Sequence, residues 1–174
     1  MSLRDAIKDK HVKAEQHRFV RLLLSGNMPV LVYGEYIANQ AECYRVLEAE
    51  AAAGGLLTGI EGIKRAALIA QDAAELGKAF NIHPSTRDYA EHLSLVPSEQ
   101  LWAHIYGRHF ADLYGGQLIK KVVPGAGRMY TFKDRSGLID AVRLKLSDDL
   151  AQEANVVFDF ALRLFDEIAD AHSL

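Results

Sequence analysis

The sequence predicts an all-α fold in the form of a single-domain helical bundle. Apolar residues recur at spacings of three and four along most of the chain, which is the period of an amphipathic helix. No segment shows the sustained alternation of period two that a half-buried strand requires, and no internal repeat occurs. With 174 residues, the chain has the length of one domain with a sizeable core, which we expect to span residues 1–174.

Helix boundaries are predicted from capping residues and from glycine and proline breakers. Ser2 followed by Asp5 resembles a capping box, and Pro97-Ser98 is expected to start a helix that contains a glycine pair. Met129–Phe132 has strand-like residues but no partner segment, so we expect a loop there. The expected helices cover approximately residues 3–24, 30–53, 56–77, 87–95, 99–123, 136–146 and 148–171. The gap between the last two is short enough that they could form one bent helix.

The composition fits a soluble cytoplasmic protein. The chain is 49% hydrophobic and 25% charged with a net charge of −3, so no general attraction to nucleic acid or to an anionic membrane is expected. Cys43 is the only cysteine, which excludes an internal disulfide and suits a reducing compartment. We expect no signal peptide, because charged residues begin at Arg4, and no apolar run approaches the roughly 20 residues that span a bilayer.

The glycine pair Gly115-Gly116 is the most informative feature of the chain. Each glycine inside a helix costs roughly 1 kcal/mol relative to alanine, so two in a row indicate that bare backbone is needed for close packing or for a bend. Asp112 lies about one turn before the pair, on the same face. This pattern favours a flat ligand on the helix backbone near a carboxylate, although an ordinary helix crossing beside a solvated aspartate would also explain it.

A histidine on the first expected helix is a candidate metal ligand. His11 follows Leu3 and Ile7 at spacings of four, which places it on the apolar stripe. Glu15 lies at i+4, where a carboxylate can fix the imidazole tautomer and strengthen the other ring nitrogen as a ligand. The alternative is a core histidine whose hydrogen bonds are satisfied within the protein.

Basic residues and other histidines also lie near this candidate site or compete with it. Arg4 and Lys8 are either solvated surface residues or partners for acidic groups of a ligand bound near His11. His109 could reach the same pocket as Asp112, and four further histidines are expected to be exposed, namely His17, His83, His92 and His172. No histidine spacing matches a zinc or di-iron site, so a one-histidine site points to heme, which brings its own equatorial ligands.

Two segments resemble the heme oxygenases of the biliverdin-forming, all-helical type. Leu3–Glu15 is similar to the proximal helix of that family, and Ala103–Lys121 is similar to its distal helix. A weaker match, Glu153–Glu167, resembles the closing helix. The resemblance spans almost the whole chain and implies one heme oxygenase-like domain, with heme sandwiched between the first helix and a kinked distal helix.

The resemblance also implies roles for particular residues. His11 would be the axial ligand of the heme iron, with Glu15 as its hydrogen-bond partner. Contacts with the heme propionates are implied for Arg4, Lys8, Tyr106 and Arg143. Catalytic roles are implied for Asp112, Arg108, Gly115 and Gly116: the aspartate would organise a proton-donating water network that includes the arginine, and the glycines would lie against the heme face.

The implied activity is the cleavage of heme to biliverdin, expected to be the IXα isomer, with carbon monoxide and Fe2+. It requires O2 and electrons from an external ferredoxin-like or NADPH-dependent reductase donor, because the sequence has no flavin or nicotinamide motif. A bilin reductase would be a downstream partner, and the family resemblance suggests a monomer. Two alternatives remain: a non-catalytic heme carrier or sensor on the same fold, and a helical interaction module or thiaminase-like relative that binds no heme.

Four positions depart from the family pattern. Ala111 replaces a glycine before the distal aspartate, and Tyr114 replaces a small serine before the glycine pair. Leu47 falls where many members have a tyrosine in the distal hydrogen-bond network, so a rearranged network is expected. Ile139 replaces a basic residue at a propionate-contact position.

Overall fold

The computed structural model describes residues 2–174, and this part of the chain contains helices and turns but no strand. The all-α prediction is therefore confirmed. The α-helices are α1 (Leu3–Gln16), α2 (Arg18–Leu24), α3 (Val30–Ala53), α4 (Ala66–Leu76), α5 (Pro84–Leu95), α6 (Leu101–Ile105), α7 (Ala111–Tyr114), α8 (Gly116–Ile119), α9 (Arg135–Arg143) and α10 (Ala151–Ala171). A π-helix, η3 (Tyr106–Phe110), joins α6 to α7, and 3-10 turns are found at Glu61–Ile63, Ser98–Gln100, Arg128–Tyr130 and Asp148–Leu150.

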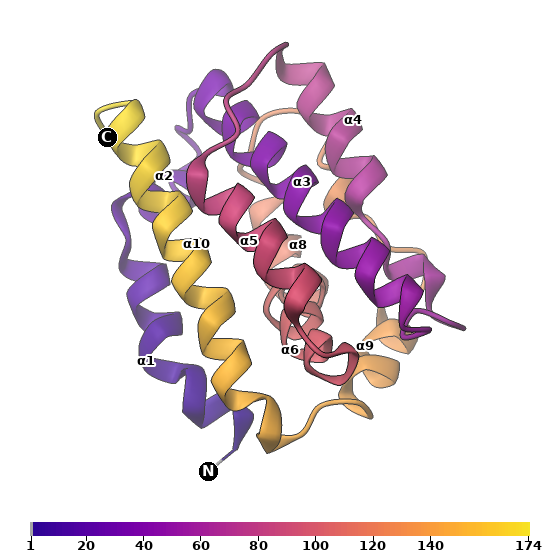
Figure 1. Cartoon of the computed structure of the whole chain (residues 1–174). Helices are drawn as coiled ribbons and strands as arrows, with labels where there is room; N and C mark the ends of the chain where they lie inside the picture. The colour runs from indigo at the N-terminus through magenta and orange to yellow at the C-terminus, as the bar shows by residue number, and fades with distance from the viewer. Residues whose placement is uncertain (1) are drawn as a thin grey trace.

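The long helices α3 and α10 organise the bundle (Figure 1). Helix α10 contacts α1, α2, α5 and α6, while α3 contacts α4 and α5. Fully buried side chains such as Ile37, Leu47, Leu113 and Ile168 form the core between these helices. The N-terminal helix α1 lies beside α10 in Figure 1, so the first and last helices together form one wall of the molecule.

The first predicted helix is divided in two at His17. Its backbone is extended (φ −62°, ψ 138°), and its Nδ1 accepts a hydrogen bond from the Phe19 amide at 3.1 Å, which caps α2. The other ring nitrogen lies 2.8 Å from an Asp166 carboxylate oxygen. The prediction of one helix through Leu24 was therefore wrong, and so was the expectation that His17 is exposed, because its side chain is only 12% exposed.

The segment 56–77 is helical only in its second half. Gly55 and Gly59 have positive φ angles and form turns, and α4 begins at Ala66. The Glu48 carboxylate on α3 accepts hydrogen bonds from the backbone amides of Arg65 and Ala66, which are unpaired donors at this helix start. A distant residue, invisible to local sequence patterns, thus fixes where α4 starts.

The glycine-bearing helix is bent earlier than predicted. The π-helix begins just before Gly107, where an added Cβ would lie 2.7 Å from Val157 Cγ1 on α10. A π-turn changes the direction of a helix and often occurs at functional sites. The helix ends at Ile119 rather than at residue 123.

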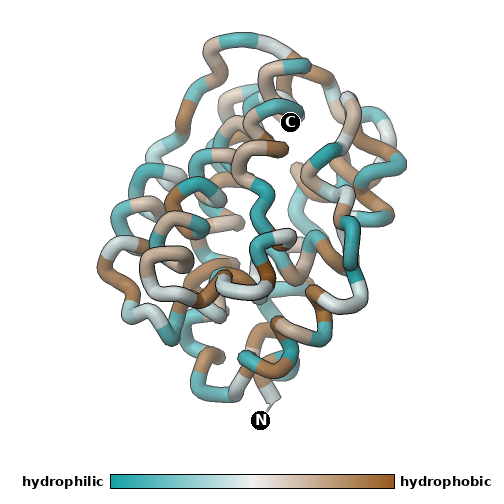
Figure 2. Tube along the Cα trace, turned by 90° about the vertical axis from the view of Figure 1, so that its right-hand side faces the viewer, coloured by the Kyte–Doolittle hydropathy of each residue, from teal (hydrophilic) through white to brown (hydrophobic). Residues whose placement is uncertain are grey.

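The other boundaries differ by smaller amounts. Helix α5 starts at Pro84 rather than at residue 87, and α9 spans Arg135–Arg143 rather than 136–146. A 3-10 turn at Arg128–Tyr130 lies in the expected loop, and the last two helices are separate. No helix in residues 2–174 is long and apolar enough to cross a membrane. Figure 2 shows the same property, because hydrophobic and hydrophilic residues alternate in short stretches along the trace.

Candidate functional site

A cavity of about 440 Å3 separates α1 from the bent helix that runs from α6 to α8. Its lining comes from α1, α2, α3, the bent helix and α10. A second hollow of about 750 Å3 opens beside it toward the start of α1 and the end of α9. His11 and Tyr114 line both hollows, so the two adjoin, and together they are termed the recess.

One wall of the recess carries His11. Its Nδ1 lies 3.5 Å from the Glu15 carboxylate, as the i+4 spacing predicted, and its ring packs edge-on against Phe158 of α10. Leu3 and Ile7, on the same stripe, are buried. The His11 side chain itself is 53% exposed, because it faces the recess rather than the core. It is therefore not a core histidine, and its ring is accessible to a ligand.

On the opposite wall, only one glycine of the Gly115-Gly116 pair presents bare helix backbone to the cavity. Gly115 lines the cavity, and a Cβ there would meet only the Ala111 carbonyl oxygen at 3.6 Å. Gly116 is buried on the other side, where a Cβ would lie 2.5 Å from the Tyr130 ring. The expectation that both glycines face the ligand is thus wrong: Gly115 faces the recess, while Gly116 allows close packing.

Asp112 is held by a tyrosine from α3. The Tyr44 hydroxyl donates a hydrogen bond to the Asp112 carboxylate, which lines the cavity. Burial raises the pKa of Asp112 to about 7, although the Tyr44 bond and the nearby Arg108 charge act in the opposite direction. A carboxyl group with a pKa near neutrality can both hold and release a proton under ordinary conditions.

Arg108 belongs to the same polar cluster through other partners. Its Nη1 donates to Gln40 Oε1 at 2.8 Å, and its Nε donates to the Tyr89 hydroxyl at 2.9 Å. The guanidinium lies over the Tyr89 ring at 4.3 Å. Arg108, Gln40 and Asp112 all line the cavity, and no hydrogen bond joins Arg108 to Asp112 directly.

The mouth of the recess is basic. All four residues that the sequence assigned to acidic groups of a ligand line it together: Arg4, Lys8, Tyr106 and Arg143. Tyr114, one of the departures from the family pattern, lies at the same mouth and accepts a hydrogen bond from the Arg143 guanidinium. Its hydroxyl therefore positions a basic side chain instead of pointing away from the recess.

The structure also places three other residues that the sequence analysis singled out, and it corrects the expectation for His109. Leu47 is fully buried in the core, and the tyrosine that reaches Asp112 is Tyr44, one helical turn earlier. His109 does not line the cavity, because its ring packs on Tyr44 and its Nε2 lies 2.9 Å from Glu48. Ile139 is buried and does not line the recess.

The histidines expected to be exposed are partly buried and paired with carboxylates. His83 and His172 lie 2.5 Å and 3.1 Å from the two oxygens of Glu35. His92 lies 2.5 Å from Glu153. Their polar sequence neighbours gave no indication of these pairings, because each partner is on a distant segment of the chain.

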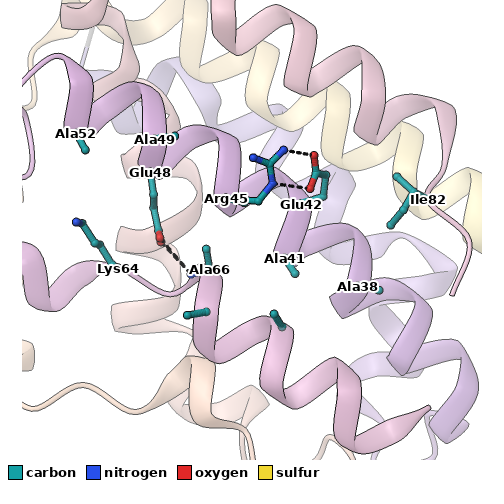
Figure 3. A pocket seen from close by; sticks show the side chains of 12 residues that line it. Ala38, Ala41, Glu42, Arg45, Glu48, Ala49, Ala52, Lys64, Ala66 and Ile82 are labelled. Carbon is teal, nitrogen blue, oxygen red and sulfur yellow. Dashed lines mark hydrogen bonds and ion pairs between the residues drawn. The ribbon is translucent and has the colours of Figure 1, made fainter. Parts of the chain in front are cut away.

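A further hollow of about 650 Å3 lies between α3 and α4, outside the recess (Figure 3). Its floor is formed largely by alanines. At its edge Arg45 forms an ion pair with Glu42 at 2.6 Å, and the Glu48 carboxylate accepts a hydrogen bond from the Ala66 amide at the start of α4. None of the predicted site residues lines it. We therefore place the functional site in the recess beside His11.

Residues of α3 are the main component that the sequence reasoning missed. Tyr36, Gln40 and Tyr44 follow each other at spacings of four and all line the cavity. Three polar or amphipathic side chains at spacings of four, on one face of the helix, were a detectable signal. Their connection to Asp112 was not detectable, because it depends on how two distant helices pack.

The fold and the recess together define a helical protein in which a histidine and bare helix backbone line one slot with a basic open end. The family model described as heme oxygenase matches residues 1–164. The chain therefore belongs to the heme oxygenase family.

Individual relatives agree with this assignment. The heme oxygenase of Pyropia yezoensis is 27% identical, over 95% of this chain and 84% of that protein. Heme oxygenase 2 of Mus musculus is 27% identical, over 99% of this chain but only 66% of its own length.

Solved structures share the fold. Heme oxygenase-1 from the cyanobacterium Synechocystis, in complex with heme, superposes with a TM-score of 0.83 at 22% identity and covers 98% of this chain and 94% of that one. The heme oxygenase of Leptospira interrogans gives a TM-score of 0.84 at 23% identity, covering 96% and 100% of the two chains.

Proposed function

We propose that this protein is an active heme oxygenase that cleaves heme to biliverdin, with the IXα isomer as the expected product, together with carbon monoxide and Fe2+. The observation that carries the proposal is the recess in which His11 on α1 faces the bare backbone at Gly115, with Asp112 beside it. Membership of the heme oxygenase family and the heme complex of the Synechocystis relative support heme as the ligand.

The residues of the recess fit heme. A planar ring requires a slot without side chains on one face, and a side chain at Gly115 would project into this slot. The lining is otherwise mostly apolar and includes Phe158, Phe165 and Val157 of α10. The only histidine that lines the cavity is His11, so a ligand that supplies its own equatorial nitrogens suits this donor set.

Basic side chains are placed to fix the rotation of the ring. Arg4, Lys8 and Arg143 line the open end, where two carboxylates on one edge of heme would be held by charge-assisted hydrogen bonds. Tyr114 holds Arg143 in place. We propose that these contacts set the orientation of the porphyrin and thereby decide which position of the ring is opened.

Asp112 is the proposed source of proton control. Its carboxyl group has a pKa of about 7, and Tyr44 holds it on the distal side of the slot. Bound heme supplies the iron that activates dioxygen and the porphyrin ring that is opened. We propose that Asp112 delivers protons to this side through water, and that Arg108 keeps the surrounding polar groups aligned.

The reaction also requires reducing equivalents from outside the chain. We propose a ferredoxin-like protein or an NADPH-dependent reductase as the donor. We also propose a bilin reductase as a consumer of the product. The alternative of a non-catalytic heme carrier rested on a lost tyrosine at Leu47, and the Tyr44 hydroxyl bound to Asp112 favours the enzyme over the carrier.

The proposal is tested by an absorption time course of the purified chain with one equivalent of hemin, a ferredoxin reducing system and catalase. We expect the Soret band to decay while bile-pigment absorption grows, and chromatography identifies the isomer. His11→Ala is expected to bind hemin without forming biliverdin. A Soret band that persists in the unaltered protein would show that heme is bound but not opened, and an unchanged biliverdin yield in His11→Ala would defeat the ligand assignment.

A further inference from the structure

Three potential metal ligands converge where α5, α6 and α10 meet. His92, His104 and Glu153 each offer one ligand atom, and these atoms lie within 4.8 Å of one another. His92 Nε2 lies 2.5 Å, and His104 Nε2 2.8 Å, from the same carboxylate oxygen, Glu153 Oε1. The two imidazoles therefore point at one position from different helices.

We propose that His92, His104 and Glu153 form a binding site for a divalent transition-metal ion, with Zn2+ as the preferred ion. Two histidines and one glutamate, with a fourth position for water, are a common zinc ligand set. Ligand atoms bound to zinc lie about 2.0–2.2 Å from the ion, hence roughly 3.3 Å from each other. To reach this spacing, His92 Nε2 and His104 Nε2 would each move away from Glu153 Oε1 by less than about 1 Å.

The surroundings of the cluster combine one fixed ligand with access from solvent. The His104 side chain is completely buried, and its Nδ1 lies 2.8 Å from the Tyr89 hydroxyl, which in turn accepts a hydrogen bond from Arg108. A partner on the second ring nitrogen orients a histidine for metal binding. The His92 side chain is 31% exposed, so an ion can enter from that side.

A second cluster of the same composition provides a matched comparison. His83 and His172 also contact one glutamate, Glu35, but they lie against different oxygens, Oε1 and Oε2. The carboxylate therefore stands between the two imidazoles, which do not converge on one position. Removing His172 deletes a half-buried, glutamate-bound histidine without changing the proposed site.

The test is a titration of the heme-free 174-residue chain with Co2+, followed by displacement with Zn2+ and calorimetry with Zn2+ alone. We expect one ion per chain, with visible Co2+ absorption that Zn2+ removes and Mg2+ does not, since Mg2+ prefers six oxygen ligands. His92→Ala and Glu153→Gln are expected to weaken Zn2+ binding by at least about tenfold. His172→Ala is expected to bind as the unaltered chain does.

Several results would overturn the proposal. One is the absence of visible Co2+ absorption at millimolar Co2+. Another is a Zn2+ affinity of His92→Ala equal to that of the unaltered chain. A third is a loss of Zn2+ binding in His11→Ala, which would place the ion at His11. Fe2+ is expected to compete more weakly than Zn2+ under anaerobic conditions, and the reverse order would refute the assignment to zinc. If Glu153→Gln does not fold, His92→Ala decides the question, because its partly exposed position tolerates truncation.

Discussion

Replacing Asp112 with asparagine is expected to stabilise the heme-free protein at pH 8 much more than at pH 5. The Asp112 carboxyl has a pKa of about 7 in the folded protein and an ordinary value of 3.8. Between these values the unfolded chain is ionised while the folded chain holds the proton, so the free energy of unfolding falls as the pH rises. Asparagine resembles the protonated acid, can still accept the Tyr44 hydrogen bond, and does not titrate.

The size of the effect follows from the pKa difference. Each pH unit between 5 and 7 lowers the free energy of unfolding by about 1.4 kcal/mol, which gives an upper limit of about 2.5 kcal/mol between pH 5 and pH 8. Asp112 lines a cavity and is partly exposed, so solvent reduces this amount. We expect the stability difference between Asp112→Asn and the unaltered chain to grow by about 1 kcal/mol or more over this range.

The assay is urea unfolding of both proteins at pH 5, 6, 7 and 8, followed by circular dichroism at 222 nm. Asp9→Asn removes an exposed carboxylate of α1 and serves as the control, for which no growing difference is expected. The same Asp112→Asn protein is expected to give much less biliverdin. A stability difference that is the same at pH 5 and pH 8 would refute the reasoning, because it would mean that Asp112 titrates normally in the folded state.

The remaining predictions concern the glycine pair and the basic mouth. Gly116→Ala is expected to lower the free energy of unfolding by about 1–3 kcal/mol, because its Cβ would overlap the Tyr130 ring. Gly115→Ala is expected to leave the free energy of unfolding within about 1 kcal/mol of the unaltered chain but to weaken hemin binding, measured by Soret titration. Loss of stability in Gly115→Ala together with loss of hemin binding in Gly116→Ala would contradict the assignment of Gly115 to the recess and Gly116 to the packing face. Arg143→Gln is expected to alter the ratio of biliverdin isomers on chromatography. Tyr114→Phe is expected to alter this ratio less strongly, because it removes only the hydrogen bond to Arg143. Unchanged isomer ratios in both variants would show that this contact does not control the orientation of the ring.

Local patterns predicted those parts of the fold that depend on neighbouring residues. The bounds of α3 at Val30 and Ala53 were predicted correctly from the proline before it and the glycines after it. The start of α4 was missed, because Glu48, from another helix, supplies the cap at Ala66. The break at His17 was missed for a related reason: a histidine side chain that caps α2 replaced the residues that usually mark a helix start.

The candidate site was predictable where its residues lie close together in the sequence. His11 and Glu15 are one turn apart, and their contact follows from helix geometry alone. The distal network differs, because Tyr44 and Asp112 are 68 positions apart. The resemblance assigned the network tyrosine to Leu47, one turn from Tyr44, and only the packing of α3 against the bent helix shows which residue reaches the carboxylate.

The two glycines show why a sequence motif can be correct while its physical interpretation is incomplete. Both were expected to lie against a ligand, since bare backbone is uncommon in a helix. In the folded protein, the Tyr130 ring occupies the space beside Gly116, and only Gly115 opens on the recess. Gly116 lets the helix approach Tyr130 closely, which holds the helix in the position from which Gly115 can form a bare wall. A ligand slot therefore needs both residues, one for the contact and one for the packing behind it, and substitutions at the two positions should separate binding from stability.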